Sequence, residues 1–575
     1  MGLFACFLLL YLWSHISNFF NRDPLYYALQ VETSPSWAAL LSDRHHLLYR
    51  PVARLWFTLW QALGYREGAI FPLQALSALV GAAAVAIFFL LCLRLTQSRR
   101  WALLAAAFLG FSYGMWRYSA EAYPHIFLLL FTVSAALALA VGLQENAPAG
   151  LPRHRLRAFS VAGILTALAA LFYQTGVFFA VAALWLILAR RQASRSSRAS
   201  AALAFLLPCF ALALLYLWVI TSQERGIGGI LHYQYGPSGW MGYGKIMPAN
   251  LLKAPVGAAN LFVGEVFARE HLSALPKVKG ILISHSGIPA LPHDGAPPSL
   301  AALLPLYLLL GASLLALVRL IFLVFFNWRR MGEQFPLGRA LAMVWLIPYA
   351  AFPIWWFPEN RQYWLGALPP LCLLFSLAAK ACPHPGSPAK RPGGLRLLAL
   401  SAGLLALTNL FGSIGPDRRP ESNPLLQRTY ALADIIGPRD LVITMSAGEL
   451  KHLSCYLEYY LRCRTVDLLA LFFSPKGEAA GRERILQEIS LASSEGGRIY
   501  LISEAMTSPL IYRQIAKYKS VSPEQVEKVL QGFLSPLNPT LVVSFSGKPL
   551  LHRLEPASAP SSIVTPTPRR ASSSP

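Results

Sequence analysis

Long stretches without a charged side chain constrain this chain more than any other feature of its sequence. A membrane-spanning helix needs about 20 predominantly apolar residues. Only 13% of the residues are charged, whereas a soluble protein carries roughly 25%. We therefore predict a polytopic α-helical membrane protein, and we exclude one large soluble enzyme. Stretches free of Asp, Glu, Lys and Arg lie at 1–21, 68–93, 101–116, 122–144, 158–189, 199–223, 295–318, 340–358, 362–379 and 397–416.

The stretch at 158–189 is too long for one span and just long enough for two. Arginines crowd both of its borders, at 153–157 and at 190–198. Loops rich in arginine stay on the cytoplasmic side of a membrane, so both ends of this stretch should lie on that side. We therefore predict two spans with an outer apex near Tyr173 and Gln174, which makes eleven spans in all.

Alternating these eleven spans separates the basic loop residues by side. Lys and Arg gather in the predicted inner loops, whereas the short outer turns carry Arg117 and Arg361. This bias predicts a cytoplasmic amino terminus and an extracytoplasmic C-terminal part. Because inner loops explain the net charge of +23, we predict no nucleic-acid partner. Richness in Ala, Leu and Arg suggests a bacterial inner membrane with a periplasmic outer face.

Three long segments follow on the predicted outer side. They are a first loop at 22–67, a Gly- and Pro-rich loop at 224–294, and the C-terminal part from residue 417 onward. The predicted membrane domain spans 1–416. Apolar β-rich runs at 440–445, 465–473, 497–502 and 540–546 alternate with helix-like stretches within 417–555, which predicts a small α/β domain. No glycine-rich phosphate loop follows its predicted strands, so we interpret it as an accessory or binding domain. The Pro-, Ser- and Thr-rich tail at 556–575 is predicted to be disordered.

The first outer loop carries ionisable groups beside the membrane boundary, where such groups usually have a functional reason. Asp23 follows the first span directly, and His45, His46 and Tyr49 stand in a second polar block that opens with Asp43. Leucines and tryptophans around these groups predict helices that lie in the interface plane. The structural alternative is a solvated acid at a helix end with interfacial histidines.

Two short outer turns hold the remaining candidate groups. Arg117 and Glu121 stand four residues apart and precede Tyr123, so they can pair on one helical face or face a substrate. Arg361 precedes Tyr363 at a late span mouth. Its guanidinium can hold a phosphate bidentately, or it can anchor the span beside neighbouring tryptophans.

Taken in order, these motifs resemble the GT-C membrane glycosyltransferases. The shared features are an acid after the first span, a second acid in the second outer turn, and a late Arg-x-Tyr. The blocks His45–Tyr49 and Trp116–Pro124 are similar to a bacterial branch near the protein mannosyltransferase-like and aminoarabinose transferase-like groups. The resemblance covers residues 1 to about 415. Two departures stand out: Asp23 stands between Arg22 and Pro24, where the family often has an acidic doublet or Gly-Asp, and Gln174 replaces a common His or Lys.

This resemblance implies sugar transfer from a polyprenyl-phosphate-linked donor to a glycan, lipid or protein acceptor at the outer face. Asp23, with Asp43 as the alternative, would accept the proton of the acceptor hydroxyl. Glu121 would orient the acceptor, or help to bind a divalent cation if one is used. Arg361, with His45 or His46, would stabilise the leaving phosphate. The resemblance also implies substrate contacts for Tyr49, Arg117, Tyr123, Gln174 and Tyr363, and sugar stacking on Tyr233, Tyr235, Trp240 and Tyr243.

Two other function classes remain open. A transporter or flippase of a lipid-linked or amphipathic substrate would place charges and broken helices near the bilayer midplane. The ionisable groups of this chain instead collect at one predicted face. A noncatalytic envelope assembly protein is supported chiefly by the predicted outer α/β domain.

Overall fold

A helical membrane unit and a smaller α/β unit make up the chain. The computed structural model describes residues 1–19, 23–41, 43, 45–144, 153–189, 194–223, 248–264, 300–358, 360–382, 393–445, 452–474, 477–545 and 547–555. The division falls between Met1–Pro424 and Leu425–Pro575.

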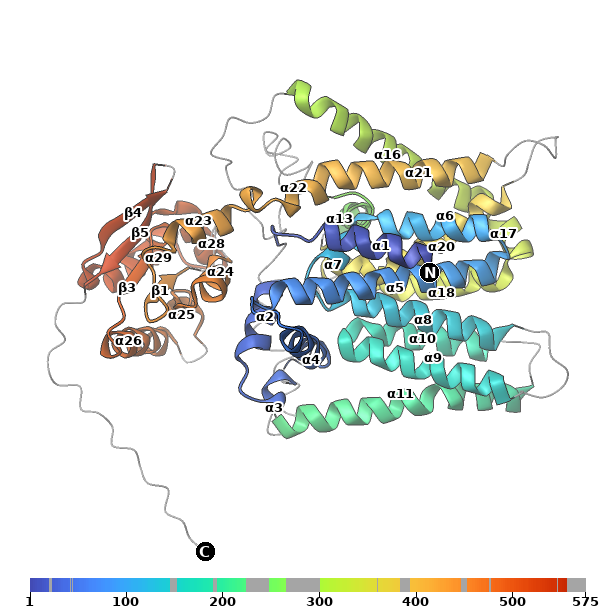
Figure 1. Ribbon diagram of the computed structural model, residues 1–575, viewed down its shortest axis with the longest axis horizontal. Coiled ribbons are helices and arrows are strands. Elements are labelled where there is room, and N and C mark those ends of the chain that lie inside the picture. The colour runs from blue at the N-terminus through green and yellow to red at the C-terminus, as the bar shows by residue number, and fades with distance from the viewer. Residues whose placement is uncertain are drawn as a thin grey trace, which may run out of the picture. The chain divides into compact units, whose positions relative to one another are not determined.

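Helices that lie alongside one another form the first unit (Figure 1). Within the described ranges, eight are long and apolar enough to cross a membrane, and the other three predicted spans correspond to shorter helices. The predicted polytopic helical class is therefore confirmed. The long helices are α5 (Ile70–Thr96), α8 (His125–Leu143), α9 (Arg153–Phe172), α11 (Arg195–Gln223), α16 (Leu300–Phe326), α18 (Pro336–Trp356), α20 (Leu368–Ala381) with the turn before it, and α21 (Gly393–Asn409) with its π-helical end. The shorter ones are α1 (Gly2–Trp13), α6 (Arg99–Phe111) and α10 (Val177–Leu188).

The apex predicted inside the 158–189 stretch is present. Helix α9 ends at Phe172, a 3₁₀ turn occupies Gln174–Gly176, and α10 starts at Val177. A Cβ atom on Gly176 would overlap the backbone of α9 at Ala169 and Ala170, so the tight return requires glycine there. Two antiparallel helices therefore replace one overlong span.

The predicted span at 101–116 is interrupted. The first residues of the predicted second outer turn are helical and belong to a separate helix. Helix α6 ends at Phe111, Ser112 is extended, and a separate helix α7 (Tyr113–Ala120) follows. All eight residues of α7 are buried. Gly81 in α5 lets α7 approach closely, since a Cβ there would overlap the Ser119 side chain. The segment is thus part of the packed interior.

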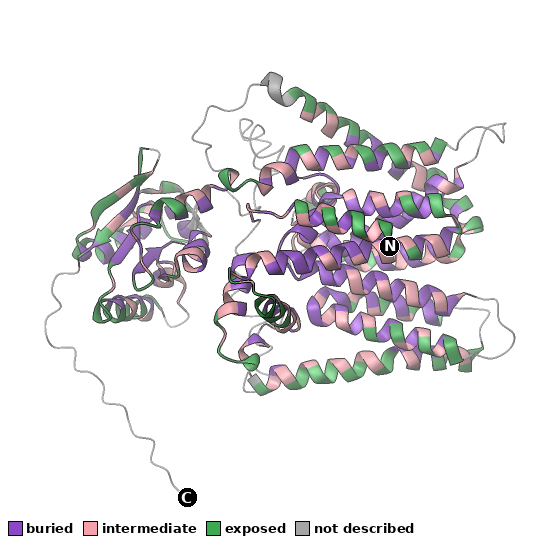
Figure 2. Cartoon of the chain, in the orientation of Figure 1, coloured by how far each residue is buried: buried purple, intermediate pink, exposed green. Residues whose placement is uncertain are grey.

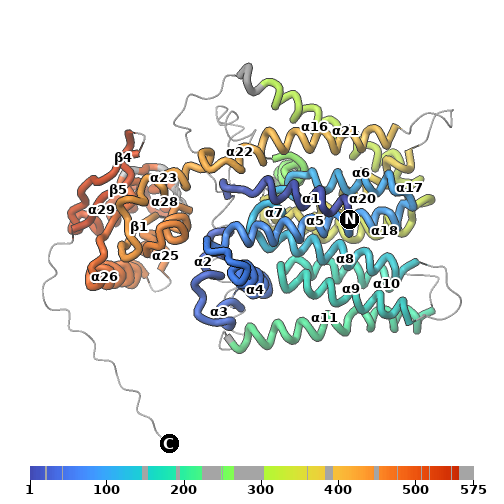
Figure 3. Tube along the Cα trace, in the orientation of Figure 1, coloured from blue at the N-terminus to red at the C-terminus, as the bar shows by residue number. Residues whose placement is uncertain are grey.

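Short helices cover one end of the bundle. These are α2 (Asp23–Thr33), α3 (Trp37–Leu40) and α4 (Tyr49–Ala62), and α17 (Trp328–Gln334) lies at the opposite end (Figure 3). Helix α4 is seen nearly end-on where the spans run across the view, and it exposes Leu55 and Leu59. A helix that lies in the membrane interface exposes such an apolar stripe to lipid.

Exposure across the bundle follows the expected pattern for a protein in lipid. Helices α11 and α16 lie at its two edges and leave many apolar side chains exposed, whereas α5 and α8 are largely buried (Figure 2). The described part of the predicted 224–294 loop contains a helix, α13 (Pro248–Ala259). The Asn250 amide of α13 donates to the Ile354 carbonyl of α18, N···O 3.0 Å.

A five-stranded sheet forms the centre of the second unit, which agrees with the predicted α/β domain. Its order is β2-β1-β3-β5-β4, with β1 parallel to β2 and β3 and with β5 antiparallel to β3 and β4. The strands are β1 (Leu441–Thr444), β2 (Arg464–Asp467), β3 (Ile499–Ile502), β4 (Thr540–Phe545) and β5 (Lys548–Leu554).

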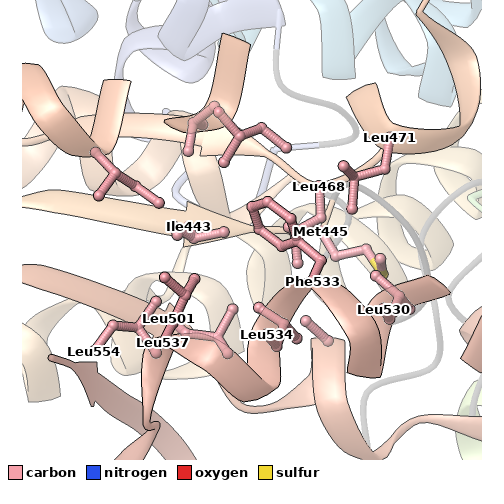
Figure 4. Close-up of a cluster of buried hydrophobic side chains, with 14 of the residues drawn as sticks. Ile443, Met445, Leu468, Leu471, Leu501, Leu530, Phe533, Leu534, Leu537 and Leu554 are labelled. Atoms are coloured by element: carbon pink, nitrogen blue, oxygen red, sulfur yellow. The ribbon is translucent and has the colours of Figure 1, made fainter. Parts of the chain in front are cut away.

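Successive side chains of a strand point to opposite faces of the sheet. Both sets are apolar in the central strands of this sheet, so helices cover both faces. Ile443 and Leu501 pack with Phe533 on one face (Figure 4), and Val442 and Tyr500 lie on the other. The first face is covered by α26 (Glu478–Ser494), α28 (Pro509–Lys519) and α29 (Pro523–Leu534), and the second by α23 (Pro424–Leu432) and α24 (Leu453–Tyr456).

Two local predictions for this unit were wrong. The end of the β-rich run predicted at 465–473 is a helical turn, α25 (Ala470–Phe473), and strand β5 was not predicted. Cys455 and Cys463 in this unit are both free buried thiols.

Candidate active site

Asp23 begins α2 at the end of the bundle and meets residues that are far away in the sequence. The Tyr123 hydroxyl donates to Asp23, Oη to Oδ2 2.7 Å, across 100 residues. The same hydroxyl lies 3.2 Å from the Gln362 side-chain oxygen in α19 (Arg361–Trp364). One phenol therefore joins the first outer loop, the start of α8 and the late span mouth.

Arg361 begins the short helix that contains Gln362. Its side chain is 1% exposed, and its guanidinium carbon lies 4.8 Å from the ring centroid of Tyr113. The guanidinium also acts electrostatically on the Tyr118 hydroxyl, and the rings of Tyr118 and Tyr123 are 5.4 Å apart. Asp23 and Arg361 are therefore linked through two tyrosines.

Arg117 and Glu121 form the pair that their spacing allows. The Arg117 Nε atom donates to Glu121 Oε2 at 2.9 Å, and the two side chains are 2% and 0% exposed. Arg117 Nη1 also pairs with Asp417, which the sequence did not single out. Glu121 is therefore held in a buried ion network, and it acts on nearby groups through that network.

The network fixes the chain that leads into Asp23. Arg117 Nη2 donates to the Asn18 carbonyl oxygen at 2.5 Å. The backbone amides of Ser17 and Asn18 donate to the Asp417 carbonyl oxygen at 3.0 and 2.9 Å. Residues 17 and 18, which follow the first span, are thus bound to α7 and to the end of the last span.

His46 lies in a buried position that determines its chemistry. Its Nδ1 atom is 3.0 Å from the Phe172 carbonyl oxygen, and a carbonyl only accepts, so Nδ1 carries the proton. Burial lowers the pKa of His46 below its usual value, although Asp43 opposes this effect. A neutral His46 offers a lone pair at Nε2 and has no second N–H for a phosphate.

His45 connects the first loop with the α9–α10 apex. Its Nδ1 atom lies 3.1 Å from the Gln174 side-chain oxygen, and the Gln174 amide donates to the Tyr216 hydroxyl at 3.2 Å. Gln174 therefore replaces the family's basic residue with a group that orients His45. The structure brings these two predicted substrate-binding residues together.

Asp43, the alternative base, has other partners. Its carboxylate accepts from the His45 backbone amide at 3.0 Å and lies 3.7 Å from the Arg50 guanidinium. The Asp43 carboxylate is therefore already held by a guanidinium and a backbone amide, whereas Asp23 accepts from the neutral Tyr123 phenol.

Rings surround these polar groups. Tyr49 lies 5.0 Å from Tyr27, and Tyr363 lies 5.8 Å from Phe352 between centroids. His125, the first residue of α8, lies among Tyr118, Tyr123 and Tyr173, and sequence reasoning missed it. The available signal was an ionisable residue at the start of a predicted span.

The described ranges give no support to a divalent-cation site. They contain no group of three or more His, Cys, Asp or Glu side chains that could hold a metal. Glu121 and Asp417 share Arg117, and Asp43 lies beside Arg50, so these carboxylates already face cations. We derive no step through a metal. The predicted stacking residues at 233–243 lie outside the described ranges.

Comparison with known proteins gives no sequence relative but a clear structural likeness. No family model matches the chain. No curated protein matches it. ArnT from Cupriavidus metallidurans bound to undecaprenyl phosphate is 12% identical with a TM-score of 0.54, over 96% of this chain and 97% of that one. The Archaeoglobus fulgidus oligosaccharyltransferase in complex with Zn and sulfate is 14% identical with a TM-score of 0.51, over 92% and 70%. The chain therefore has the fold of the GT-C membrane glycosyltransferases.

Proposed function

We propose that this chain is a membrane glycosyltransferase that moves a sugar from a polyprenyl-phosphate-linked donor to a hydroxyl of an acceptor. The observation that carries the proposal is the linkage of Asp23 and Arg361 through Tyr118 and Tyr123 at one end of a GT-C fold. ArnT, which has a similar fold, was crystallised with undecaprenyl phosphate, and this supports a lipid phosphate as the donor's leaving group.

Asp23 is the proposed general base. The acceptor oxygen attacks the anomeric carbon while Asp23 takes its proton, and the bond from that carbon to the phosphate oxygen breaks. The phosphate leaves with the bonding electrons. Because carboxylates are weak bases near neutral pH, proton transfer accompanies bond formation. The Tyr123 hydroxyl, 2.7 Å from Asp23, orients the carboxylate for this step.

Arg361 is the proposed partner of the leaving phosphate. A guanidinium binds phosphate oxygens bidentately, and a buried one is screened less by water than a surface one. It therefore stabilises the charge that develops as the phosphate departs. His45 remains a candidate for the same phosphate, whereas the neutral His46 is better suited to accept a hydrogen bond from a hydroxyl.

Glu121 and Arg117 act indirectly in this proposal. Their buried pair with Asp417 fixes the exit of the first span, and this fixes the position of Asp23. Tyr49, Gln174 and Tyr363 remain candidate substrate contacts at the border of the site. This assignment replaces a direct role of Glu121 on the acceptor or on a metal.

The proposed orientation of the chain in the membrane follows from the distribution of Lys and Arg among its loops. We propose a multi-pass protein of the bacterial inner membrane, with a cytoplasmic amino terminus and a periplasmic α/β unit. The proposed acceptor is a glycan, a lipid or a protein that is reached from the outer face. An outer site explains a lipid-linked donor, since nucleotide sugars are cytoplasmic substrates.

Turnover of lipid-linked sugars by the full chain in lipid nanodiscs tests the proposal. The probes are undecaprenyl phosphates that carry different single sugars, each offered with membrane acceptors. We expect Asp23→Asn to lower turnover by about 10² to 10⁴-fold and to leave thermal unfolding unchanged. Asp43→Asn is the matched control, with a much smaller expected loss. Normal turnover by Asp23→Asn would refute the assigned base, and the reverse ranking would move that role to Asp43.

Arg361→Gln tests the phosphate contact separately. We expect it to weaken binding of undecaprenyl phosphate itself by at least about tenfold, because a charge-assisted contact is lost. Unchanged binding would remove Arg361 from the phosphate site.

A further inference from the structure

His125 is a buried imidazole that has no hydrogen-bond partner within the described residues. It is 2% exposed, and among the described residues nothing hydrogen-bonds to its Nδ1 or Nε2 atom. Buried polar atoms in proteins nearly always have partners, and an exception needs an explanation. Leaving a buried donor and a buried acceptor unmatched destabilises the fold. A ligand that supplies both partners is one physical explanation.

Four rings enclose His125 and give it the environment of a ligand site. Its centroid lies 4.0 Å from that of Tyr173, 4.5 Å from that of Tyr123 and 5.7 Å from those of Tyr118 and His46. The Tyr118 ring is inclined by only 20° to His125. Small-molecule sites combine aromatic walls of this kind with a few placed polar groups.

This cluster also lies where the reacting sugar must be. In the transfer step, the anomeric carbon has the acceptor oxygen on one side and the leaving phosphate on the other. The sugar ring therefore lies between the base Asp23 and the guanidinium of Arg361. Tyr123 contacts the first of these groups, Tyr118 is affected by the second, and His125 packs against both tyrosines.

We propose that His125, together with His46, binds hydroxyl groups of the transferred sugar and thereby selects that sugar. The proposal rests on the proposed function. A neutral imidazole presents one donor and one acceptor, which match two neighbouring hydroxyls. His46 adds an acceptor at Nε2, because its Nδ1–H group already donates a hydrogen bond to the Phe172 carbonyl oxygen. The favoured substrate is a neutral, hydroxylated sugar.

His46 is the more exposed of the two imidazoles, so we place the entry of the sugar on the His46 side of the cluster. Sites built to bond a hydroxyl reject analogues that lack it far more strongly than apolar pockets reject a missing methylene. Removal of the imidazole should therefore affect sugar recognition and leave binding of the lipid phosphate intact.

His125→Phe is the first test variant, because it keeps a ring of similar shape and removes both nitrogens. We measure kcat and KM with sugar-bearing undecaprenyl phosphates, binding of sugar-free undecaprenyl phosphate, and the thermal unfolding midpoint. We expect kcat/KM to fall on the order of 100-fold, sugar-free lipid binding to stay within about twofold, and the midpoint not to decrease. His125→Asn, which restores a donor and an acceptor, should recover part of the transfer.

His15→Phe is the matched control. His15 lies outside the cluster and its Nδ1 atom has a partner, the Leu12 carbonyl at 3.3 Å, so transfer should be unchanged. Normal transfer by His125→Phe would overturn the inference, as would a lower midpoint with no recovery by His125→Asn, which marks an ordinary core histidine. A wild-type chain that neither transfers any sugar nor binds undecaprenyl phosphate would instead overturn the proposed function.

Discussion

Replacing Arg117 with methionine should destabilise the membrane unit far more than an ordinary loss of an ion pair. Arg117 Nε lies 2.9 Å from Glu121 Oε2, its Nη1 pairs with Asp417, and its Nη2 donates to the Asn18 carbonyl at 2.5 Å. The two carboxylates are buried, so the variant leaves both without the guanidinium. Methionine fills a similar volume, which isolates the electrostatic effect.

The expected magnitude follows from burial. Removing one partner of a buried ion pair costs about 3–5 kcal/mol, because the remaining charge stays desolvated. The chain offers a matched control in Arg329 and Glu333, which have the same four-residue spacing and a 3.1 Å contact but are 93% and 61% exposed. An exposed pair contributes about 0–1 kcal/mol, so Arg329→Met should have little effect.

Denaturant unfolding in detergent micelles, followed by tryptophan fluorescence, measures both variants. Adding Glu121→Gln to Arg117→Met should recover roughly 1–3 kcal/mol, since it removes one desolvated charge. A loss below about 1 kcal/mol for Arg117→Met, or a further loss on adding Glu121→Gln, would refute the proposed network.

Two further predictions concern packing and acid stability. Gly366→Ala would drive a Cβ into the Tyr349 ring and should cost about 1–3 kcal/mol in the same assay, whereas Gly403, with open space around it, should tolerate alanine. Burial opposes ionisation of Asp440, but its hydrogen bonds with Arg498 and a backbone amide outweigh burial and lower its pKa below 3.8. A lowered pKa stabilises the fold above that unfolded value, and the stabilisation is lost as pH falls through the folded value. In Asp440→Asn, the thermal unfolding midpoint of the second unit should therefore fall less steeply as the pH drops below about 4 than it does in the wild type. Thermal unfolding of the full chain at several pH values measures this. An unchanged dependence on acid pH would contradict the prediction.

Sequence predicts the spans of this chain well because membrane insertion depends on local composition. Apolar length alone located the helices, and basic borders divided the 158–189 stretch into α9 and α10. The break at Ser112 was missed because glycine is common within membrane spans, so Gly110 and Gly114 beside it gave no clear signal. Helix α7 is buried by tertiary packing, which includes its contacts with α5. Strand β5 was missed because its pairing partners, β3 and β4, are set by tertiary structure.

The candidate site was also predictable only where local sequence determines it. The distribution of basic residues predicted that Asp23 and Arg361 lie at an outer rim, since each stands at the end of an apolar run. The Tyr123 hydroxyl contacts Asp23 and Gln362, which lie 100 and 239 residues away in the sequence, and no local pattern encodes such contacts. Asp417 pairs with Arg117 across 300 residues, so the sequence identified the Arg117–Glu121 pair and not its third member.

Buried polar groups at this rim fall into two kinds, and the difference between them indicates function. Arg117 is matched by several acceptors within the fold, as a group that maintains structure should be. His125 is enclosed just as completely, yet within the described residues it finds neither a donor nor an acceptor. A fold gains nothing from an unmatched imidazole, because phenylalanine would fill the space without the desolvation penalty. Partners that arrive with a ligand would explain a histidine there, and the proposed base Asp23 and the proposed phosphate contact Arg361 fit a ligand that carries both hydroxyls and a phosphate.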